Sequence, residues 1–369
     1  MVTRRSAVEG MERLENSLAF FSGKKVFITG HTGFKGSWLV TILKELGANV
    51  CGYSLPPPTN PSLFSIAKLS KDICDISGDI RDYGALNKAV SDFEPDIVFH
   101  LAAQPLVIEG YRDPLSTYST NVMGTVNILE AVRRLNKDLS FVNVTTDKVY
   151  KNREWPWGYR ENEELNGYDP YSNSKSCSEL VTQSFKLSYF QENIVRVSTA
   201  RAGNVIGGGD FSENRIIPDC VRSASRHETI FVRNPSSVRP YQHVLEPLFA
   251  YLLIAMKQYE NPALCGSYNV GPNEGDCLKT SELVELFCNS WGEGICWKQK
   301  GMAAQPHEAN LLRLDISKIK STLGWKPVWD ASQAIDKTVQ WAKFWLSGNT
   351  DIRQVMVQQI KAYIADASK

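Results

Sequence analysis

Short hydrophobic runs alternate with longer amphipathic stretches over the first half of the chain. Such alternation is typical of parallel strands joined by helices that cover both faces of one sheet. The predicted strands cover residues 25–29, 49–53, 72–76, 97–101, 141–145 and 194–197. The predicted helices cover residues 36–46, 83–93, 115–135 and 171–191. The pattern therefore predicts a doubly wound parallel α/β sheet, whose ligands bind beyond the carboxyl ends of the strands.

The regular alternation ends near residue 204, where a glycine-rich segment begins. Mixed short strands and helices follow, and the helical patterns over 281–290 and 331–345 each have an apolar face. A smaller mixed α/β lobe is therefore expected after the sheet domain, with some chain returning to the large domain. The expected N-terminal extension, sheet domain and smaller lobe cover residues 1–23, 24–204 and 205–369.

Composition excludes several classes of protein. The chain has 41 Lys and Arg against 40 Asp and Glu, so no overall charge favours nucleic acid. Its eight cysteines form no CxxC pair and its five histidines lack ligand spacing, so no metal site is predicted. No apolar run reaches the roughly 18–20 residues that span a bilayer, and the N-terminus lacks the hydrophobic core of a signal peptide. We therefore expect a cytoplasmic protein with reduced thiols.

The first predicted strand runs directly into a GxxGxxG turn and then an amphipathic helix. Glycines at these positions allow the backbone to approach a pyrophosphate, which the helix N-terminus then stabilises. A tight turn alone would also explain them, but the position at the first strand-to-helix turn favours a dinucleotide in a Rossmann domain. Asp79 and Ile80, after the third strand, are expected at the adenine, although Asp79 could instead cap a helix. The predicted contacts here are Gly30, Thr32, Gly33, Phe34, Lys35, Gly36, Asp79 and Ile80.

Two further strand ends carry candidate site residues. Small residues after the fourth strand would let the chain pass beneath a flat cofactor, although packing alone also explains alanines there. Tyr171 and Lys175 share one helical face, so the ammonium is expected to favour the ionised phenol and make it a usable base. Leu101, Ala102, Ala103, Gln104, Asn121, Thr145, Tyr171 and Lys175 complete the predicted cofactor contacts.

These motifs resemble the extended short-chain dehydrogenase/reductase family, and within it the nucleotide-sugar 4,6-dehydratases. The resemblance covers residues 24 to about 345 and implies NAD as the cofactor. Thr146-Asp147-Lys148 departs from the dTDP-glucose and GDP-mannose enzymes, in which glutamate follows the aspartate. Lysine at this position, with the segments over 30–38 and 239–247, resembles the dehydratases that use CDP-glucose.

The resemblance implies a lyase that removes water by internal oxidation and reduction. Tyr171, assisted by Lys175, would take the proton of the 4-hydroxyl, to which Thr146 would hydrogen-bond. Lys148 would remove the C5 proton and Asp147 would protonate the departing 6-hydroxyl, while NAD holds the hydride. Lys148 could instead only pair with Asp147 or the substrate. The product would enter deoxysugar synthesis for surface polysaccharide such as the O-antigen of lipopolysaccharide.

Substrate contacts are expected mainly from the smaller lobe, where arginines can bind two phosphates. Each arginine alone could be a surface charge, and His243 could be structural. A homo-oligomer, dimer or tetramer, is expected through a four-helix interface formed by helices 115–135 and 171–191. A dehydratase or 4-epimerase for another nucleotide sugar remains an alternative, as does a non-enzymatic NAD sensor. The predicted substrate contacts are Gln104, Asn204, Arg215, Arg233, Arg239, Gln242 and His243.

Overall fold

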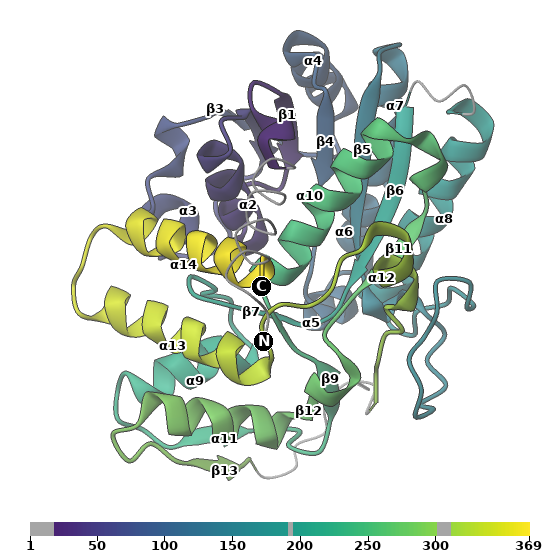
Figure 1. The fold of residues 1–369 in the computed structure, drawn as a ribbon. Helices are drawn as coiled ribbons and strands as arrows, with labels where there is room; N and C mark the ends of the chain where they lie inside the picture. Colours follow the sequence, from purple (N-terminus) through teal and green to yellow (C-terminus); the bar gives the residue numbers. More distant parts are fainter. Residues whose placement is uncertain (1–17, 191–194, 301–310) are drawn as a thin grey trace.

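The computed structural model describes residues 18–190, 195–300 and 311–369. Within these residues, seven parallel strands form the central sheet (Figure 1), which confirms the predicted doubly wound fold. The first six strands have the order that is common in dinucleotide-binding domains, and β11 extends the sheet beyond β6. In spatial order the strands are β11 (Ser267–Val270), β6 (Val195–Ala202), β5 (Leu139–Thr146), β4 (Ile97–His100), β1 (Lys25–Thr29), β2 (Asn49–Ser54) and β3 (Cys74–Ser77).

The strand register brings the functional strand ends together. Thr29, the last residue of β1, pairs with His100, the last residue of β4. β5 lies beside β4 and runs on to Thr146. Since all these strands are parallel, the segments that follow β1, β4 and β5 leave the sheet at the same edge.

Helices cover both faces of the sheet. Figure 1 shows α10 in front of β5 and β6, and α14 packs against α2 on this same side. One hydrophobic cluster on this face includes Trp38, Leu248 and Ile360, whereas a second cluster on the opposite face includes Phe27 and Leu86. The first face is covered by α2 (Phe34–Glu45), α10 (Leu245–Glu260) and α14 (Ile352–Ala367), and the second by α4 (Tyr83–Phe93), α7 (Gly124–Arg134) and α8 (Pro170–Tyr189).

The single helix predicted over 115–135 is interrupted. It consists of α6 (Pro114–Tyr118), a π-helical turn η3 (Ser119–Met123) and α7. In this wider turn the Asn121 side chain accepts a hydrogen bond from the backbone N–H of Gln104 at 2.8 Å. Helical periodicity over a long segment does not report a single wider turn within it.

A smaller lobe lies at the bottom of the view in Figure 1. Its own hydrophobic cluster joins Ile217, Phe287 and Ile335, one from each of its three longer helices. These helices are α9 (Ile216–Ala224), α11 (Thr280–Trp291) and α13 (Ala331–Leu346). The strands outside the central sheet are β7 (Val205–Ile206), β8 (Ile230–Val232), β9 (Val238–Pro240), β10 (Gln242–His243), β12 (Cys277–Lys279) and β13 (Trp297–Gln299). The remaining helices are α3 (Leu63–Ile66), α5 (Val107–Arg112) and α12 (Ser317–Leu323).

Later parts of the chain return to the sheet, as the sequence pattern suggested. α10, β11 and α14 all belong to the sheet layers rather than to the smaller lobe. Leu18 and Phe21, within the predicted N-terminal extension, are buried in the core of the large domain. Of the helices in the described ranges, none is both long and apolar enough to cross a membrane. That the sheet domain binds the dinucleotide and the smaller lobe binds the substrate stays a prediction.

Candidate active site

A cavity of about 720 Å³ lies beyond the carboxyl ends of β1, β4 and β5. Its walls come from the sheet domain on one side and from residues 203–241 and Thr280 on the other. The sequence-predicted residues in its wall are Gly30, Thr32, Gly33, Phe34, Lys35, Gly36, Asp79, Ile80, Leu101, Ala102, Ala103, Thr145, Thr146, Asp147, Lys148, Tyr171, Lys175, Asn204, Arg215, Arg233 and Arg239.

Gln104 and Asn121 do not line the described cavity, so the cofactor contacts predicted for both, and the substrate contact predicted for Gln104, stay predictions. The Gln104 amide donates to Thr117 at 2.9 Å and accepts from the Leu106 backbone at 2.6 Å. The buried Asn121 amide donates to the Gln104 carbonyl and to Ser174. Both amides therefore brace the loop after β4, and this loop holds Ala102 and Ala103 against the cavity.

Gln242 and His243 are likewise absent from the described wall, and their predicted substrate contacts stay predictions. Gln242 donates from its side chain to the carbonyl of Val270 at 3.0 Å, across to β11. His243 is fully buried between the rings of Trp38 and Trp329. Burial lowers the pKa of His243 to about 3, so the ring is neutral. The structural alternative for this histidine is the one the geometry supports.

The glycine turn has the shape that a pyrophosphate requires. Gly30 has φ +79°, and a Cβ there would lie 2.7 Å from the backbone nitrogen of Ala102. At Gly36 a Cβ would lie 2.3 Å from the carbonyl oxygen of Gly30. A Cβ at Gly33, by contrast, would meet only that same oxygen at 3.5 Å, so the helix N-terminus stays open toward the cavity. The turn therefore fits a dinucleotide phosphate on the N-terminus of α2.

We expect Gly36→Ala to destabilise this turn and weaken dinucleotide binding. The added methyl group would collide with backbone, so the free energy of unfolding should fall by about 1–3 kcal/mol. Gly275→Ala is the matched control, because a Cβ there meets nothing within 4 Å. Urea unfolding and NAD titration by calorimetry measure both effects. Equal unfolding free energies for the two variants would contradict the proposed role of the turn.

Dinucleotide sites often have an acidic residue at the end of the second strand, where β2 (Asn49–Ser54) instead ends in Tyr53 and Ser54. There Thr32 hydrogen-bonds Ser54 at 2.9 Å and donates to the carbonyl of Leu55 at 3.0 Å. Asp79 forms an ion pair with Arg81, which lowers the pKa of the Asp79 carboxyl. Asp82, not Asp79, caps α4 by accepting a hydrogen bond from Ala85. The helix-cap alternative for Asp79 therefore does not hold.

Tyr171 and Lys175 lie on the first turns of α8, as their spacing predicts. Asp169 caps this helix by accepting a hydrogen bond from the Ser172 backbone at 3.0 Å. Lys175 is buried and its ammonium donates to the carbonyl of Val144 at 3.2 Å. This contact fixes the ammonium beneath the end of β5, beside the cavity.

The expected lowering of the Tyr171 pKa by Lys175 is not found in this structure. Burial raises the pKa of Tyr171 to about 12, which the hydrogen bond with Thr146 opposes and the charge of Asp147 increases. Lys175 instead points its ammonium at a backbone carbonyl. Burial lowers the pKa of Lys175 to about 8, and the carboxylate of Glu179 acts in the opposite direction. Desolvation therefore outweighs the ammonium in setting the protonation of the phenol.

Thr146, Asp147 and Lys148 follow one another at the end of β5. The Thr146 hydroxyl donates to Asp147 Oδ1 at 2.9 Å, and Asp147 is only 1% exposed. Burial raises the pKa of Asp147, against the opposing effects of Lys148 and of the Thr146 hydrogen bond. Its other oxygen, Oδ2, is buried and has no hydrogen-bond partner among the described residues. A buried carboxyl with a raised pKa in a cavity wall suits the role of a general acid.

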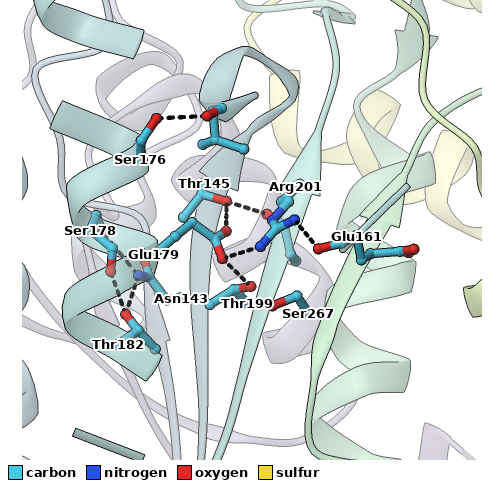
Figure 2. A network of polar contacts seen from close by, with 12 residues as sticks. Asn143, Thr145, Glu161, Ser176, Ser178, Glu179, Thr182, Thr199, Arg201 and Ser267 are labelled. Carbon is cyan, nitrogen blue, oxygen red and sulfur yellow. Dashed lines mark hydrogen bonds and ion pairs between the residues drawn. The ribbon is translucent and has the colours of Figure 1, made fainter. Parts of the chain in front are cut away.

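A buried ion pair that the sequence analysis missed supports this strand end. Figure 2 shows Glu179 of α8 beside Arg201 of β6, at 2.8 Å, with both side chains almost fully buried. Thr145 and Thr199 also donate to the Glu179 carboxylate, at 2.5 and 2.8 Å. Glu179 is four residues after Lys175, so helical spacing alone placed it on the same face. Its partner on β6 could only be seen in the fold.

The cavity also gathers cations around Asp147. Lys35 faces it from α2 and donates to the hydroxyl of Tyr251 at 3.4 Å. Burial lowers the pKa of Lys35 to about 7, and Arg215 lowers it further. In the smaller lobe, Arg215 pairs with Asp210 at 3.0 Å and Arg233 donates to the carbonyl of Asn214. The two lobes thus surround the cavity with positive charge, which suits a ligand that carries phosphates.

Comparison with known proteins agrees with this geometry. The chain is 46% identical to a CDP-glucose 4,6-dehydratase of Salmonella typhimurium, over 95% of this chain and 99% of that protein. It is 26% identical to a dTDP-glucose 4,6-dehydratase of Xanthomonas campestris pv. campestris, over 88% of this chain and 95% of that one.

Solved structures share the fold at lower identity. DesIV, a dTDP-glucose 4,6-dehydratase from Streptomyces venezuelae solved with NAD bound, has a TM-score of 0.75 and 22% identity, and the match covers 86% of this chain and 97% of that one. A family model described as GDP-mannose 4,6 dehydratase matches residues 27–338. With that match and the 46% identity over nearly its whole length, the chain belongs to the GDP-mannose 4,6-dehydratase family.

Proposed function

We propose that this protein is a CDP-glucose 4,6-dehydratase, which converts CDP-glucose into CDP-4-keto-6-deoxyglucose and water. The observation that carries the proposal is the buried acid Asp147 beside Tyr171 in a cavity lined by cations. The substrate follows from the full-length similarity to the Salmonella enzyme of that name. A lysine at position 148, where glutamate is typical of the dTDP-glucose and GDP-mannose enzymes, supports the same substrate.

NAD fits the residues of the cavity. The chemistry it supplies when bound is reversible acceptance of a hydride, so that C4 is oxidised and C6 is later reduced with no net change. The turn at Gly30, Gly33 and Gly36 would hold the pyrophosphate and Asp79 would face the adenine. Tyr171 and Lys175 would border the nicotinamide side.

Oxidation at C4 requires a base for the 4-hydroxyl proton. Tyr171 would accept that proton as the phenolate, and Thr146 would hydrogen-bond the same oxygen. Lys175 would add positive charge near the phenolate once a ligand draws the ammonium from the Val144 carbonyl. Positive charge bound near the phenol would favour its ionised form, against the burial and the Asp147 charge that raise its pKa.

Elimination of water requires a base at C5 and an acid at O6. The 4-ketone acidifies C5, and we assign removal of that proton to Lys148, which lies in the cavity wall. Asp147 would give its proton to the 6-hydroxyl through Oδ2, the oxygen that Thr146 does not occupy. Arg215, Arg233 and Arg239 would bind the two phosphates of the substrate from the smaller lobe, with Asn204 beside them.

The test is to incubate the purified protein and NAD with CDP-, dTDP-, GDP- and UDP-glucose in turn. The absorbance of the 4-keto product in base should appear with CDP-glucose alone. Tyr171→Phe is the matched inactive control. Ketone from another nucleotide sugar would keep the dehydratase chemistry and overturn the substrate.

The alternatives are separable by the same samples. A 4-epimerase would yield the 4-epimer without a ketone, and it would not need Asp147. An NAD sensor would bind NAD and convert none of the sugars. The presence of Tyr171, Lys175 and a buried acid in one cavity favours the dehydratase over both.

Activity should fall as pH rises through about 8, the pKa of Lys175. This pKa lies below that of a free lysine, so the ammonium form exists below pH 8 and is lost above it. The alkaline limb of kcat/KM, which reports the free enzyme, measures this titration. Lys175→Arg keeps the charge, so its slower reaction should lack that limb. An unchanged limb in the arginine variant would assign it to another group.

We also propose that the protein forms a homo-oligomer through α6, η3 and α8. Large apolar side chains on these helices are exposed, namely Leu115 at 84%, Met123 at 52%, Leu180 at 53% and Leu187 at 58%. Apolar side chains gathered on one face favour burial against a second copy. Light scattering of Leu115→Glu and Leu187→Glu against the wild type would test this interface.

The cytoplasm is the compartment we infer for this reaction. All eight cysteines lie in the described residues as free thiols, including the register partners Cys51 and Cys74 on adjacent strands. Unpaired thiols at such spacing suit a reducing compartment. Nucleotide sugars feed the synthesis of surface polysaccharide, which the resemblance implies as the fate of the product.

A further inference from the structure

One turnover of the proposed reaction leaves two residues of the protein in altered protonation states. Tyr171 gains the proton of the 4-hydroxyl, and Asp147 loses the proton that departs with the 6-hydroxyl as water. Lys148 takes the C5 proton and returns it to C5, so its own state is restored. The overall reaction releases only water. Before the next turnover, Tyr171 therefore has to lose the proton it gained, and Asp147 has to gain the proton it lost.

A single hydroxyl group lies between these two residues. The Thr146 hydroxyl donates to Asp147 Oδ1 at 2.9 Å, and it also hydrogen-bonds the Tyr171 phenol. All three side chains face the same cavity. While the Thr146 hydroxyl donates to Asp147, its oxygen can accept from the neutral phenol, which would give the chain a direction toward the carboxylate.

We propose that the Thr146 hydroxyl relays a proton from Tyr171 to Asp147 and so resets the enzyme after each turnover. This inference rests on the proposed function. In the relay the Tyr171 O–H bond breaks as a new O–H bond forms on Thr146, whose original proton passes to Asp147 Oδ1. Rotation of the carboxyl group about its Cβ–Cγ bond then presents this proton on the side of the 6-hydroxyl. One proton is lost and one gained along the chain, no electrons move, and no further reactant is needed.

Other routes to Asp147 are poorer in this geometry. Asp147 is 1% exposed, so bulk water has little access to it. Lys148, Arg239 and Lys35 act on Asp147 through their charge, and Thr146 donates a hydrogen bond to it. An arginine does not give up its proton at any working pH. Hydroxyl relays need hydrogen-bond geometry first, and Thr146 supplies it.

The kinetic test compares Thr146→Val with Thr146→Ser in the enzyme loaded with NAD. The resting valine variant equilibrates with solvent before mixing, so its first turnover should slow by less than about tenfold, the cost of one lost hydrogen bond. Later turnovers should slow by about 100-fold or more, giving a burst of ketone followed by a slow phase. Small buffer acids and bases should speed that slow phase, while the serine variant resembles the wild type.

Equal slowing of the first and later turnovers, with no effect of buffer, would overturn the relay. Thr146→Ala repeats the comparison if the valine variant does not fold. The infrared carboxyl band of Asp147 in ligand-free protein, identified by subtraction of Asp147→Asn, gives a second readout. The valine variant should raise the pKa of Asp147 and the serine variant should not. If wild-type protein forms no ketone from CDP-glucose, the proposed function fails, which is a different outcome from the failure of the relay.

Discussion

Asp147→Asn is expected to stop the reaction between oxidation of C4 and loss of water. Asparagine keeps the size of the side chain but has no acidic proton, so the 6-hydroxyl would have to leave unprotonated. Ketone formation should fall by about 10²–10⁴-fold, the usual contribution of a general acid. Tyr171 and Lys148 are untouched, so the substrate should still be oxidised reversibly and should still exchange its C5 proton.

Exchange of the C5 proton with deuterated water, followed by NMR, separates these steps. Asp147→Asn should retain exchange while losing dehydration, whereas Tyr171→Phe should lose both. If the asparagine variant loses exchange and dehydration by the same factor, Asp147 acts at or before oxidation and its role as the acid is wrong. Activity in Asp147→Asn equal to that of the wild type would also exclude the role.

Arg201→Met should lower the free energy of unfolding more than any of the other substitutions proposed here. It leaves the Glu179 carboxylate, 2% exposed, without its cationic partner between α8 and β6. Removing one member of a buried pair costs about 3–5 kcal/mol, since the remaining charge stays desolvated. Arg201 also donates to the hydroxyl of Tyr150 at 2.9 Å, and the substitution would remove that hydrogen bond too.

Urea unfolding against a matched surface pair measures this effect. Lys88 and Asp92 form an exposed pair on α4, so Lys88→Met should change the free energy of unfolding by about 0.5 kcal/mol or less. Adding Glu179→Gln to Arg201→Met should recover part of the loss, because the unpaired charge is then gone. A loss in Arg201→Met no larger than in Lys88→Met would show that Glu179 is solvated or paired elsewhere.

Local patterns predicted most of the sheet domain. α4 has the predicted bounds, and the predicted strands all occur, although β6 runs five residues beyond its predicted end at 197 and residue 194 lies outside the described residues. The same holds for α11 and α13 in the smaller lobe, which begin and end within one residue of their predicted bounds. Periodicity reports such elements well because it depends on neighbours along the chain.

The residues of the site also form two groups, those that short sequence spacing predicted and those whose position only the fold shows. The glycine turn, the Tyr171 and Lys175 pair and the three residues at the end of β5, Thr146 to Lys148, are each defined by short spacing, and the structure gathers them in one cavity. Gln242 and His243 were predicted as substrate contacts from their place in a motif. In the fold both side chains are buried, and neither lines the cavity. A linear motif shows which residue is present but not which way its side chain points.

By itself, then, the sequence determined the parallel α/β architecture and the dinucleotide turn. These two features depend on hydrophobic period and on residues within a few positions of one another, whereas the acid and C5-base candidates came from the resemblance to a known family. Only the tertiary structure decided the addition of β11, the π turn at Asn121, the Glu179–Arg201 pair and the upward shift in the Tyr171 pKa. Each of these depends on desolvation or on contacts between distant segments, whose free energies exist only once the chain has packed.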